Sequence, residues 1–184
     1  MDLVLVRHGD VESVPGMCIG HTDVPLSASG FAAIQQLATD WSGAAPRFLF
    51  TSDLKRAQQS AQVFAARFAI EPLTDPRLRE LDLGEWDGKH WDAIARSDPT
   101  RYRHWADNWV IQEAPGGESF GDLLRRTGAW LSSIGSTALV PDQVDEPSER
   151  VLIAVRSPCV APTGTRRGLA RSATGTRKIN TPFS

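Results

Sequence analysis

The sequence predicts a three-layer αβα domain of the α/β class, with a mostly parallel central sheet and helices on both faces. Three short apolar runs, Leu3–Val6, Phe48–Phe50 and Val151–Val155, are typical of strands that are buried on both faces. Segments with a helical spacing of apolar residues lie between these runs. Because strands that alternate with helices form parallel sheets, a functional site is expected where the strands end.

Helices are expected after the first two strands. Ser27 and Ser29 can cap a helix, and the apolar residues that follow them recur at helical spacing: Phe31, Ile34, Leu37 and Ala38. The segment after Asp53 shows one apolar face at the same spacing, formed by Ala57, Ala61, Phe64 and Phe68. Both patterns are typical of amphipathic helices that cover a sheet.

The middle of the chain, residues 80–115, is rich in tryptophan: Trp86, Trp91, Trp105 and Trp109. We expect an amphipathic helical insertion that packs over the sheet, and a substrate lid with aromatic walls is compatible with that expectation. A further helix is expected over Ser119–Leu131, with four inward-facing residues: Phe120, Leu123, Leu124 and Trp130.

Composition excludes several classes of function. A hydrophobic content of 41% in 184 residues is enough for one buried domain, and the net charge of −2 gives no reason to expect a nucleic-acid or membrane partner. Cys18 and Cys159 show no metal-ligand spacing, and the four histidines are spread along the chain. We therefore expect no metal, no organic cofactor and, without a secretory signal or membrane span, a cytoplasmic protein.

The character of the chain changes at Arg156. Residues 156–184 contain six basic residues and no acidic ones, whereas residues 1–155 contain all 22 acidic residues. This basic tail shows no helical or strand periodicity, and low hydrophobicity with high net charge is typical of disorder. We therefore expect one domain over residues 1–155 and an atypical tail over residues 156–184.

Arg7, His8 and Gly9 directly follow the first predicted strand. A neutral imidazole held at a strand end can attack phosphorus through one ring nitrogen. The glycine lets a phosphate approach the backbone, and the guanidinium of Arg7 matches the phosphate oxygens. Three residues alone are a weak signal, because a histidine beside an arginine is more often structural.

Four further segments occur in order after this one: Gly20–Ser27, Ser52–Ala61, Leu78–Gly88 and Pro115–Ser119. With Leu5–Gly9 they resemble the histidine phosphatase superfamily, which includes the cofactor-dependent phosphoglycerate mutases. The likeness is greatest to the branch that contains the α-ribazole phosphatases. The resemblance covers residues 1–155 and implies the phosphoglycerate mutase-like fold.

The resemblance also implies roles for individual residues. His8 becomes the nucleophile that accepts the phosphoryl group, Arg7 and Arg56 bind the phosphate, and Glu80 donates a proton to the leaving oxygen. Without the resemblance Glu80 would be interpreted as one surface carboxylate among many acids. Arg56 lies at a helix start after a strand, and helix N-termini favour anions.

Other residues near these motifs are expected to play smaller roles. His21 and Thr22 are predicted at the rim of the substrate site, although loop residues of this kind serve equally well as turns. Gly9, beside the nucleophile, is also an expected substrate contact. The carboxylates that follow Glu80 are expected to be solvated or to cap helices: Asp82, Glu85 and Asp87.

The reaction implied is hydrolysis of a phosphomonoester through a phosphohistidine. Among small phosphorylated substrates, the resemblance favours α-ribazole 5′-phosphate, which implies a role in cobalamin biosynthesis. Another small phosphorylated metabolite is the alternative. A phosphoglycerate mutase-type transferase is a further alternative, but the loop after His8 resembles the phosphatase branch more. The sequence leaves the oligomeric state open, a dimer included.

The pattern breaks at the last predicted strand. Members of the family place a second histidine just after it, but this chain has Arg156 there, and Pro158 opposes the helix that should follow. Three explanations compete. The reading frame is altered near codon 156, or the chain is a catalytically impaired or non-catalytic phosphate-binding homologue, or Arg156 replaces the positive charge of the histidine in an active enzyme.

Overall fold

The computed structural model describes residues 2–13, 15–136, 150–154 and 177–179 of the chain. Its five strands form one sheet in the order β3-β2-β4-β1-β5. Their bounds are β1 Asp2–Val6, β2 Phe48–Thr51, β3 Pro72–Thr74, β4 Arg150–Ala154 and β5 Arg177–Ile179. All neighbouring strands are parallel except β5, which is antiparallel to β1. The predicted α/β class with a mostly parallel sheet is therefore confirmed.

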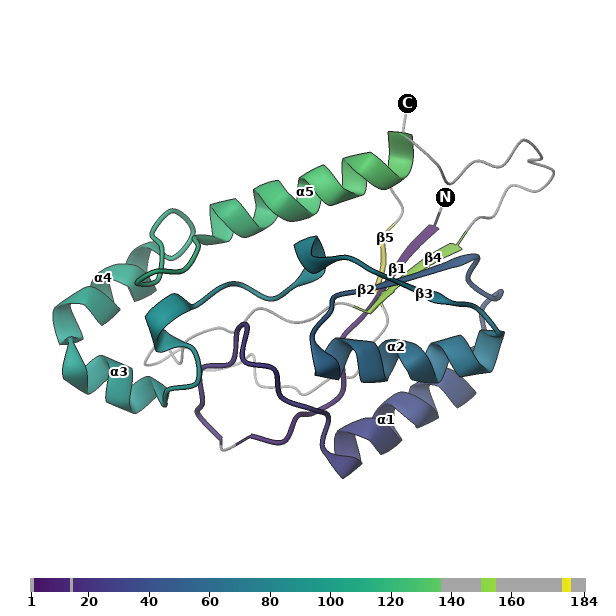
Figure 1. Ribbon diagram of the computed structural model, residues 1–184, viewed down its shortest axis with the longest axis horizontal. Coiled ribbons are helices and arrows are strands. Elements are labelled where there is room, and N and C mark those ends of the chain that lie inside the picture. Colours follow the sequence, from purple (N-terminus) through teal and green to yellow (C-terminus); the bar gives the residue numbers. More distant parts are fainter. Residues whose placement is uncertain (1, 14, 137–149, 155–176, 180–184) are drawn as a thin grey trace.

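The helices form layers on both sides of this sheet. In Figure 1, α1 and α2 cover one face and α5 runs along the other, whereas α3 and α4 lie at the far end of the molecule from the strands. The bounds are α1 Ala28–Thr39, α2 Lys55–Phe68, α3 Trp91–Ser97, α4 Pro99–Asn108 and α5 Phe120–Ser136, with two 3₁₀ turns, η1 Pro76–Leu78 and η2 Gly84–Trp86.

Strand β1 shows how the sheet is buried between the layers. Successive side chains of a strand point to opposite faces. Val4 and Val6 accordingly belong to the apolar cluster that contains Ile34 of α1 and Phe64 of α2. Leu3 and Leu5 pack instead against the cluster on the other face, which contains Phe50, Leu78 and Trp130 of α5. A strand covered on both faces explains why its sequence is a continuous apolar run.

Two apolar residues of the predicted helical patterns are exposed, and one of them, Leu124, was expected to face inward. Helix α1 begins directly after Ser27, as predicted, but buries the stripe of Ile34 and Ala38 and leaves Phe31 41% exposed. Helix α5 buries Leu123 and Trp130, which lie two turns apart on one face, and leaves Leu124 54% exposed. One helix face covers only a limited arc, so an apolar residue beside that arc remains in solvent.

The tryptophan-rich region forms a cluster of its own, which we call the aromatic cap. Its buried members are Cys18, Leu81, Leu83, Trp86, Trp91, Ile94, Trp105, Ala114 and Leu123. Within the described part of the chain, no strand residue belongs to this cluster. The expectation that the insertion packs over the sheet is therefore wrong, because α3 and α4 bury their apolar residues against each other, against loops and against the start of α5.

Most of the basic tail lies outside the described residues, as does Arg156. Three of its residues form β5, although the tail shows no strand pattern. The antiparallel pairing of β5 with β1 supplies backbone hydrogen bonds that need no apolar pattern. The expected disorder of the tail and its separation from residues 1–155 stay predictions.

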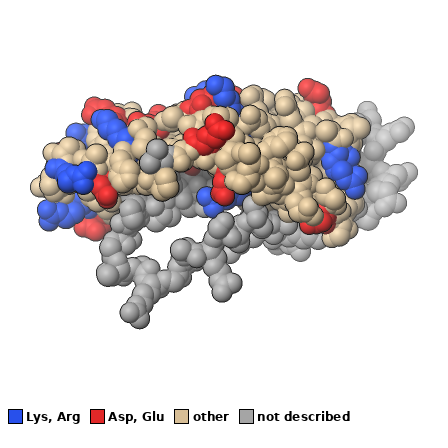
Figure 2. Space-filling model, turned by 90° about the horizontal axis from the view of Figure 1, so that it is seen from below, with Lys and Arg blue, Asp and Glu red and all other residues tan. Residues whose placement is uncertain are grey.

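The described surface carries charges of both signs. Figure 2 shows Lys and Arg side chains interspersed with Asp and Glu along the visible face. None of the helices in the described ranges is long and apolar enough to cross a bilayer.

Candidate active site

The sheet brings the ends of β1 and β2 together at one edge. Ala154 of β4 pairs in parallel register with Val6 on one side and with Thr51 on the other. The chain therefore leaves β1 and β2 at the same edge, His8 two residues after β1 and Arg56 five residues after β2. This is the arrangement in which open α/β sheets bind ligands.

His8 is half-buried, and its Nδ1 lies 2.6 Å from the carbonyl oxygen of Gly9. A carbonyl oxygen can only accept a hydrogen bond, so Nδ1 carries the hydrogen in this arrangement. In the neutral ring the lone pair is then on Nε2. Arg7, the neighbouring residue, is exposed.

The loop after His8 lies directly on the first turn of α1. A Cβ atom on Gly9 would come within 2.2 Å of the carbonyl oxygen of Gly30, and one on Gly30 within 2.0 Å of the carbonyl oxygen of Asp10. Ser27 fixes this contact, because its backbone N–H donates to the Asp10 carbonyl at 2.9 Å and its hydroxyl accepts from the Gly30 N–H at 3.0 Å. Gly9 is thus required for the close packing of this loop on α1.

Arg56 is the second residue of α2, and only 2% of it is exposed. Its Nη1 donates to the carbonyl of Thr22 at 2.8 Å, and its Nη2 donates to the carbonyl of Gly20 at 2.6 Å. The guanidinium is therefore fixed against the loop of residues 20–22, which follows the first strand in sequence. This geometry connects two of the predicted motifs.

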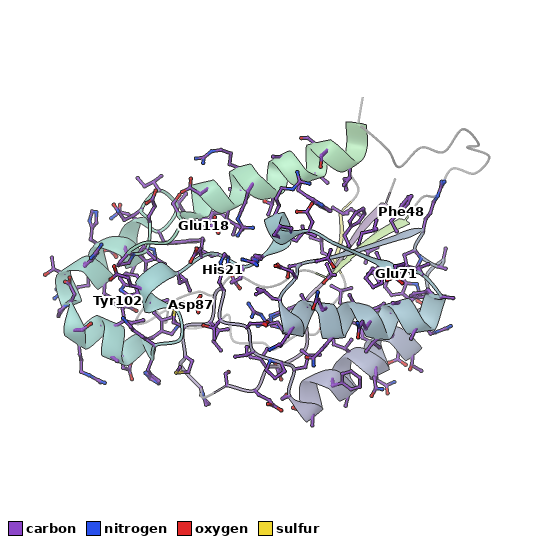
Figure 3. All side chains as sticks on the ribbon, viewed as in Figure 1. His21, Phe48, Glu71, Asp87, Tyr102 and Glu118 are labelled. Carbon is purple, nitrogen blue, oxygen red and sulfur yellow. The ribbon has the colours of Figure 1, made fainter. Side chains whose placement is uncertain are left out.

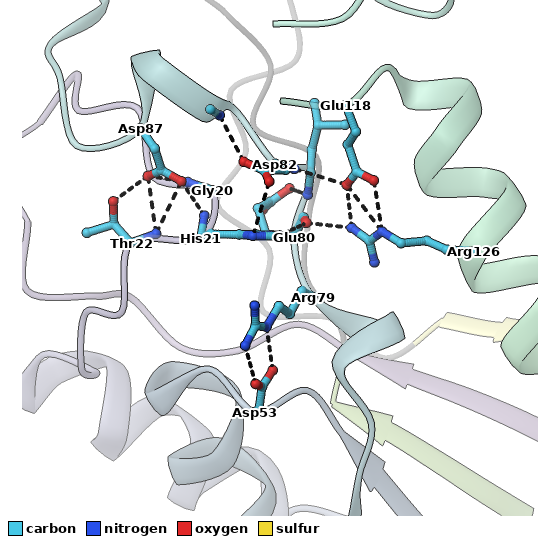
Figure 4. Close-up of polar contacts among 12 residues, drawn as sticks. Gly20, His21, Thr22, Asp53, Arg79, Glu80, Asp82, Asp87, Glu118 and Arg126 are labelled. Atoms are coloured by element: carbon cyan, nitrogen blue, oxygen red, sulfur yellow. Dashed lines mark hydrogen bonds and ion pairs between the residues drawn. The ribbon is translucent and has the colours of Figure 1, made fainter. Parts of the chain in front are cut away.

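Asp87 contacts the other side of the same loop. Its carboxylate accepts from the backbone N–H groups of Gly20 at 3.1 Å, of Thr22 at 3.2 Å and of His21, and from the Thr22 hydroxyl. We call Asp87, Arg56 and residues 20–22 the loop clamp. Figure 4 shows the contacts of Asp87 with residues 20–22, and Figure 3 labels Asp87 and His21 in the whole molecule. The expectation that Asp87 is solvated or caps a helix is wrong. No local signal marks a carboxylate whose partners lie 65 or more residues earlier.

Glu80 is buried, with 4% of its surface exposed. Its carboxylate accepts from the N–H of Leu81 at 2.8 Å. Its carbonyl oxygen accepts two hydrogen bonds, from His21 Nε2 at 2.9 Å and from Arg126 Nη2 at 2.6 Å. Figure 4 shows Glu80 between the loop of residues 20–22 and helix α5.

His21 thus contacts the backbone of Glu80, and its other ring nitrogen lies 3.6 Å from the carboxylate of Asp82. Partial burial lowers the pKa of His21, and the positive charges of Arg79 and Arg126 act in the same direction. The carboxylate of Asp82 opposes this shift. The neutral imidazole with its hydrogen on Nε2 satisfies the Glu80 carbonyl.

An ion pair connects the end of β2 to the segment before Glu80. Arg79 donates to both carboxylate oxygens of Asp53, through Nε at 2.7 Å and through Nη2. These hydrogen bonds hold the pKa of Asp53 below its usual value. Such two-point pairs fix geometry as well as charge.

The structure thus brings Arg56, His21, Thr22 and Glu80 into one network, and the sheet register brings His8 to the same edge. Arg156 cannot be placed, because it lies outside the described residues. Within the part of the chain that the structure describes, no three His, Cys, Asp or Glu residues are grouped so as to hold a metal ion. The expected absence of a metal and of an organic cofactor stays a prediction.

The fold is that of the phosphoglycerate mutase-like class of α/β proteins. A mycobacterial glucosyl-3-phosphoglycerate phosphatase superposes with a TM-score of 0.76 at 26% identity, over 84% of this chain and 73% of that one. The α-ribazole phosphatase of Shigella flexneri superposes with a TM-score of 0.74 at 25% identity, over 85% of this chain and 74% of the other.

Sequence comparison gives the family. The model of the histidine phosphatase superfamily (branch 1) matches residues 3–139, so the chain belongs to that superfamily of enzymes. The adenosylcobalamin/α-ribazole phosphatase of Escherichia coli K12 is 27% identical over 135 residues, which are 73% of this chain. The probable phosphoglycerate mutase GpmB of Proteus mirabilis is 33% identical over 134 residues, which are 72% of this chain. The chain spans 66% and 62% of these two relatives.

Proposed function

We propose that the chain hydrolyses small phosphomonoesters through a phosphohistidine at His8. The observation that carries this proposal is the hydrogen bond from His8 Nδ1 to the Gly9 carbonyl, because it leaves the lone pair on Nε2. Nε2 attacks phosphorus, an N–P bond forms, and the bond between phosphorus and the ester oxygen breaks. Water then attacks the phosphohistidine and releases inorganic phosphate.

The guanidinium groups of Arg7 and Arg56 bind the phosphate in this proposal. Two positive charges reduce the repulsion between a dianionic phosphate and the nucleophile, and they stabilise the charge on the equatorial oxygens. The side chain of Arg56 is fixed by two loop carbonyls, so it need not be reorganised when substrate binds. Arg7 is exposed, as suits a residue that reaches substrate from the edge of the sheet.

Glu80 is the proposed proton donor to the leaving oxygen, and afterwards it activates the water. Its burial and the three hydrogen bonds at its carboxylate and carbonyl fix the position of Glu80. A fixed position supports this role, because a general acid acts only within hydrogen-bond reach of the oxygen that it protonates. Gly9, His21 and Thr22 stay predicted substrate contacts. The Nε2 of His21, the hydroxyl of Thr22 and the backbone N–H groups of both residues already have protein partners, so a substrate phosphate could accept from these donors only if one of those hydrogen bonds were exchanged.

The substrate we propose first is α-ribazole 5′-phosphate, which would place the protein in cobalamin biosynthesis in the cytoplasm. The α-ribazole phosphatases among its relatives support this choice. Another small phosphorylated metabolite is the alternative, since a similar fold belongs to a glucosyl-3-phosphoglycerate phosphatase. The alternative of a phosphoglycerate mutase-type transferase is supported by the relatives described as probable phosphoglycerate mutases.

A second candidate function is phosphate binding without turnover. The observation that favours it is Arg156, which stands where members of the family have their second histidine. Loss of that hydrogen-bond donor to the phosphoryl oxygens is expected to cost about 2–4 kcal/mol in the transition state. A protein that keeps Arg7 and Arg56 would still bind phosphate or vanadate.

Hydrolysis of p-nitrophenyl phosphate and of α-ribazole 5′-phosphate, across acidic to neutral pH, tests the proposal. We expect slow turnover that His8→Ala abolishes and that Arg156→His increases on the order of a hundredfold. Equal rates for the chain and its folded His8→Ala variant would overturn the proposal. Tight vanadate binding in that case would establish the second candidate. Transfer of phosphate between positions of phosphoglycerate, in place of release, would establish the mutase.

A further inference from the structure

Arg126, a residue of α5 outside every predicted motif, makes an unusual set of contacts. Its Nη1 donates to the carbonyl of Arg77 at 2.7 Å, and its Nη2 donates to the carbonyl of Glu80 at 2.6 Å. Its Nε and Nη2 also donate to the carboxylate of Glu118 at 2.5–3.2 Å. One rigid guanidinium thus joins both ends of the segment 77–80.

Glu118 extends this connection to the residues after Glu80. Its Oε1 accepts from the N–H of Asp82 at 3.0 Å, and its own N–H donates to the Asp82 carbonyl at 2.9 Å. Arg126 and Glu118 are both largely buried, with side-chain exposures of 22% and 17%. The backbone on both sides of Glu80 is therefore attached to α5 and to the turn before it (Figure 4).

We propose that Arg126 is the positioning residue of the proton donor Glu80. This inference rests on the proposed function, in which Glu80 protonates the leaving oxygen. The carboxylate of Glu80 has few ways to move once its carbonyl is held by Arg126 and His21 and its Oε1 accepts from Leu81. A general acid displaced by a fraction of an ångström loses its hydrogen bond to the leaving oxygen, whereas the phosphate ligands and nucleophile are unaffected.

The leaving group separates this role from a merely structural one. An alkyl phosphate releases a basic alkoxide that needs a proton, whereas p-nitrophenolate leaves without one. Loss of a positioned general acid therefore slows the alkyl ester far more than the aryl ester. Loss of folded protein slows both esters by the same factor.

The experiment compares Arg126→Met with Arg125→Met, its neighbour on the same helix. Arg125 is a matched control because its side chain is 77% exposed and contacts Asp122. We expect Arg126→Met to lower kcat/KM, which reports the steps up to departure of the alcohol, about tenfold or more for an alkyl phosphate and less than about twofold for p-nitrophenyl phosphate. Arg126→Lys, which keeps the charge and one donor, should lie between wild type and Arg126→Met. Arg125→Met should match wild type on both esters. Equal losses on both esters, or none, would overturn the proposal.

A second measurement does not depend on turnover. Hydrogen exchange of the Leu81 amide, which donates to the Glu80 carboxylate, should be faster in Arg126→Met and Arg126→Lys and unchanged in Arg125→Met. If the wild-type chain turns over neither ester, the proposed function fails and this exchange alone decides the positioning role. Unchanged exchange at Leu81 in a folded Arg126→Met variant would overturn it.

Discussion

The aromatic cap and the loop clamp share one segment of chain but are stabilised in different ways. Residues 80–87 place Leu81, Leu83 and Trp86 in the cap. The same residues place Asp87 on the loop of residues 20–22, and Glu80 against His21. The cap is stabilised by burial of apolar surface, which has no direction. The clamp is stabilised by hydrogen bonds between charged side chains and the backbone, and these bonds depend strongly on distance and angle.

This difference decides what each region can do. Apolar packing tolerates small shifts of side chains as long as the total volume is kept, so the cap is suited to stabilising the fold of this region. Charged hydrogen bonds fix atoms within a few tenths of an ångström, as the proposed roles of Arg56 in phosphate binding and of Glu80 in proton donation require. The substitutions below test this division, and the first is expected to have the largest effect.

Trp105→Ala should cause the largest loss of stability. The indole is 2% exposed, stacks on Trp91 at 5.7 Å and meets Trp86 edge-on at 5.2 Å. Removing a buried tryptophan costs about 3–5 kcal/mol, chiefly as a cavity. Urea denaturation measures the change in the free energy of unfolding. A decrease in the free energy of unfolding of less than about 1 kcal/mol would contradict the view that packing in the cap is what stabilises this region.

Trp105→Phe is the matched control. The indole N–H of Trp105 is buried without a hydrogen-bond partner among the residues that the structure describes. Phenylalanine keeps most of the ring and removes that unsatisfied donor, which costs about 1–3 kcal/mol when buried. We expect the phenylalanine variant to lose less than half of what the alanine variant loses.

Asp87→Ala should have a smaller effect on stability and a larger one on binding. It removes the acceptor for three backbone N–H groups and the Thr22 hydroxyl, which should lower the free energy of unfolding by about 2–3 kcal/mol. The carbonyls that hold Arg56 lie in the same loop, so vanadate affinity measured by calorimetry should fall too.

Glu85→Ala controls for the loss of a carboxylate, since Glu85 is exposed on the same segment. It should change neither quantity. If Glu85→Ala weakened vanadate binding more than Asp87→Ala, the loop clamp would be no more important for phosphate binding than an exposed carboxylate of the same segment.

The pH dependence of stability should show the smallest effect. Because burial holds the pKa of His21 below its ordinary value, the unfolded chain binds a proton there more readily than the folded one. The stability contributed by neutral His21 is therefore fully present above the ordinary pKa of about 6.5 and decreases as pH falls below it. Charges of Asp82, Arg79, Arg126 and Glu118 face this ring and set the size of the shift.

His21→Gln removes the titrating group and keeps a donor for the Glu80 carbonyl. The slope of unfolding free energy against pH, measured between about pH 7.5 and 5.5, should be flatter in this variant. The same slope in both proteins would show that His21 has no part in it.

Much of the fold could be predicted from local patterns. Continuous apolar runs gave β1, β2 and β4 to within a residue or two, and helical spacing gave α1, α2 and α5. These patterns report burial on the faces of a sheet, which is a local property of the chain. Strand β3 shows no comparable run, because Leu73 is 43% exposed and the strand lies at the sheet edge.

The candidate site could be predicted only in part. The resemblance indicated Arg7, His8, Arg56 and Glu80, and the first three also lie beside a strand or helix end that the sequence marks. The roles of all four stay predictions. Asp87 and Arg126 could not be predicted, since their partners are backbone atoms 46 to 67 residues away. Backbone N–H and C=O groups carry no residue identity, so no sequence pattern indicates which carboxylate will accept from the former or which guanidinium will donate to the latter.

The distribution of tryptophan gives each apolar cluster its own optical reporter. Trp41 packs at the α1–α2 face, with its ring 5.9 Å from that of Phe64, and Trp130 lies on the α5 face, 5.3 Å from Phe50. The stacked Trp91 and Trp105 rings report on the cap. Replacing all but one of the six tryptophans by phenylalanine would let fluorescence follow each cluster separately. Coincident melting curves would show one cooperative unit, and an earlier transition of the cap reporter would identify it as a separate folding unit.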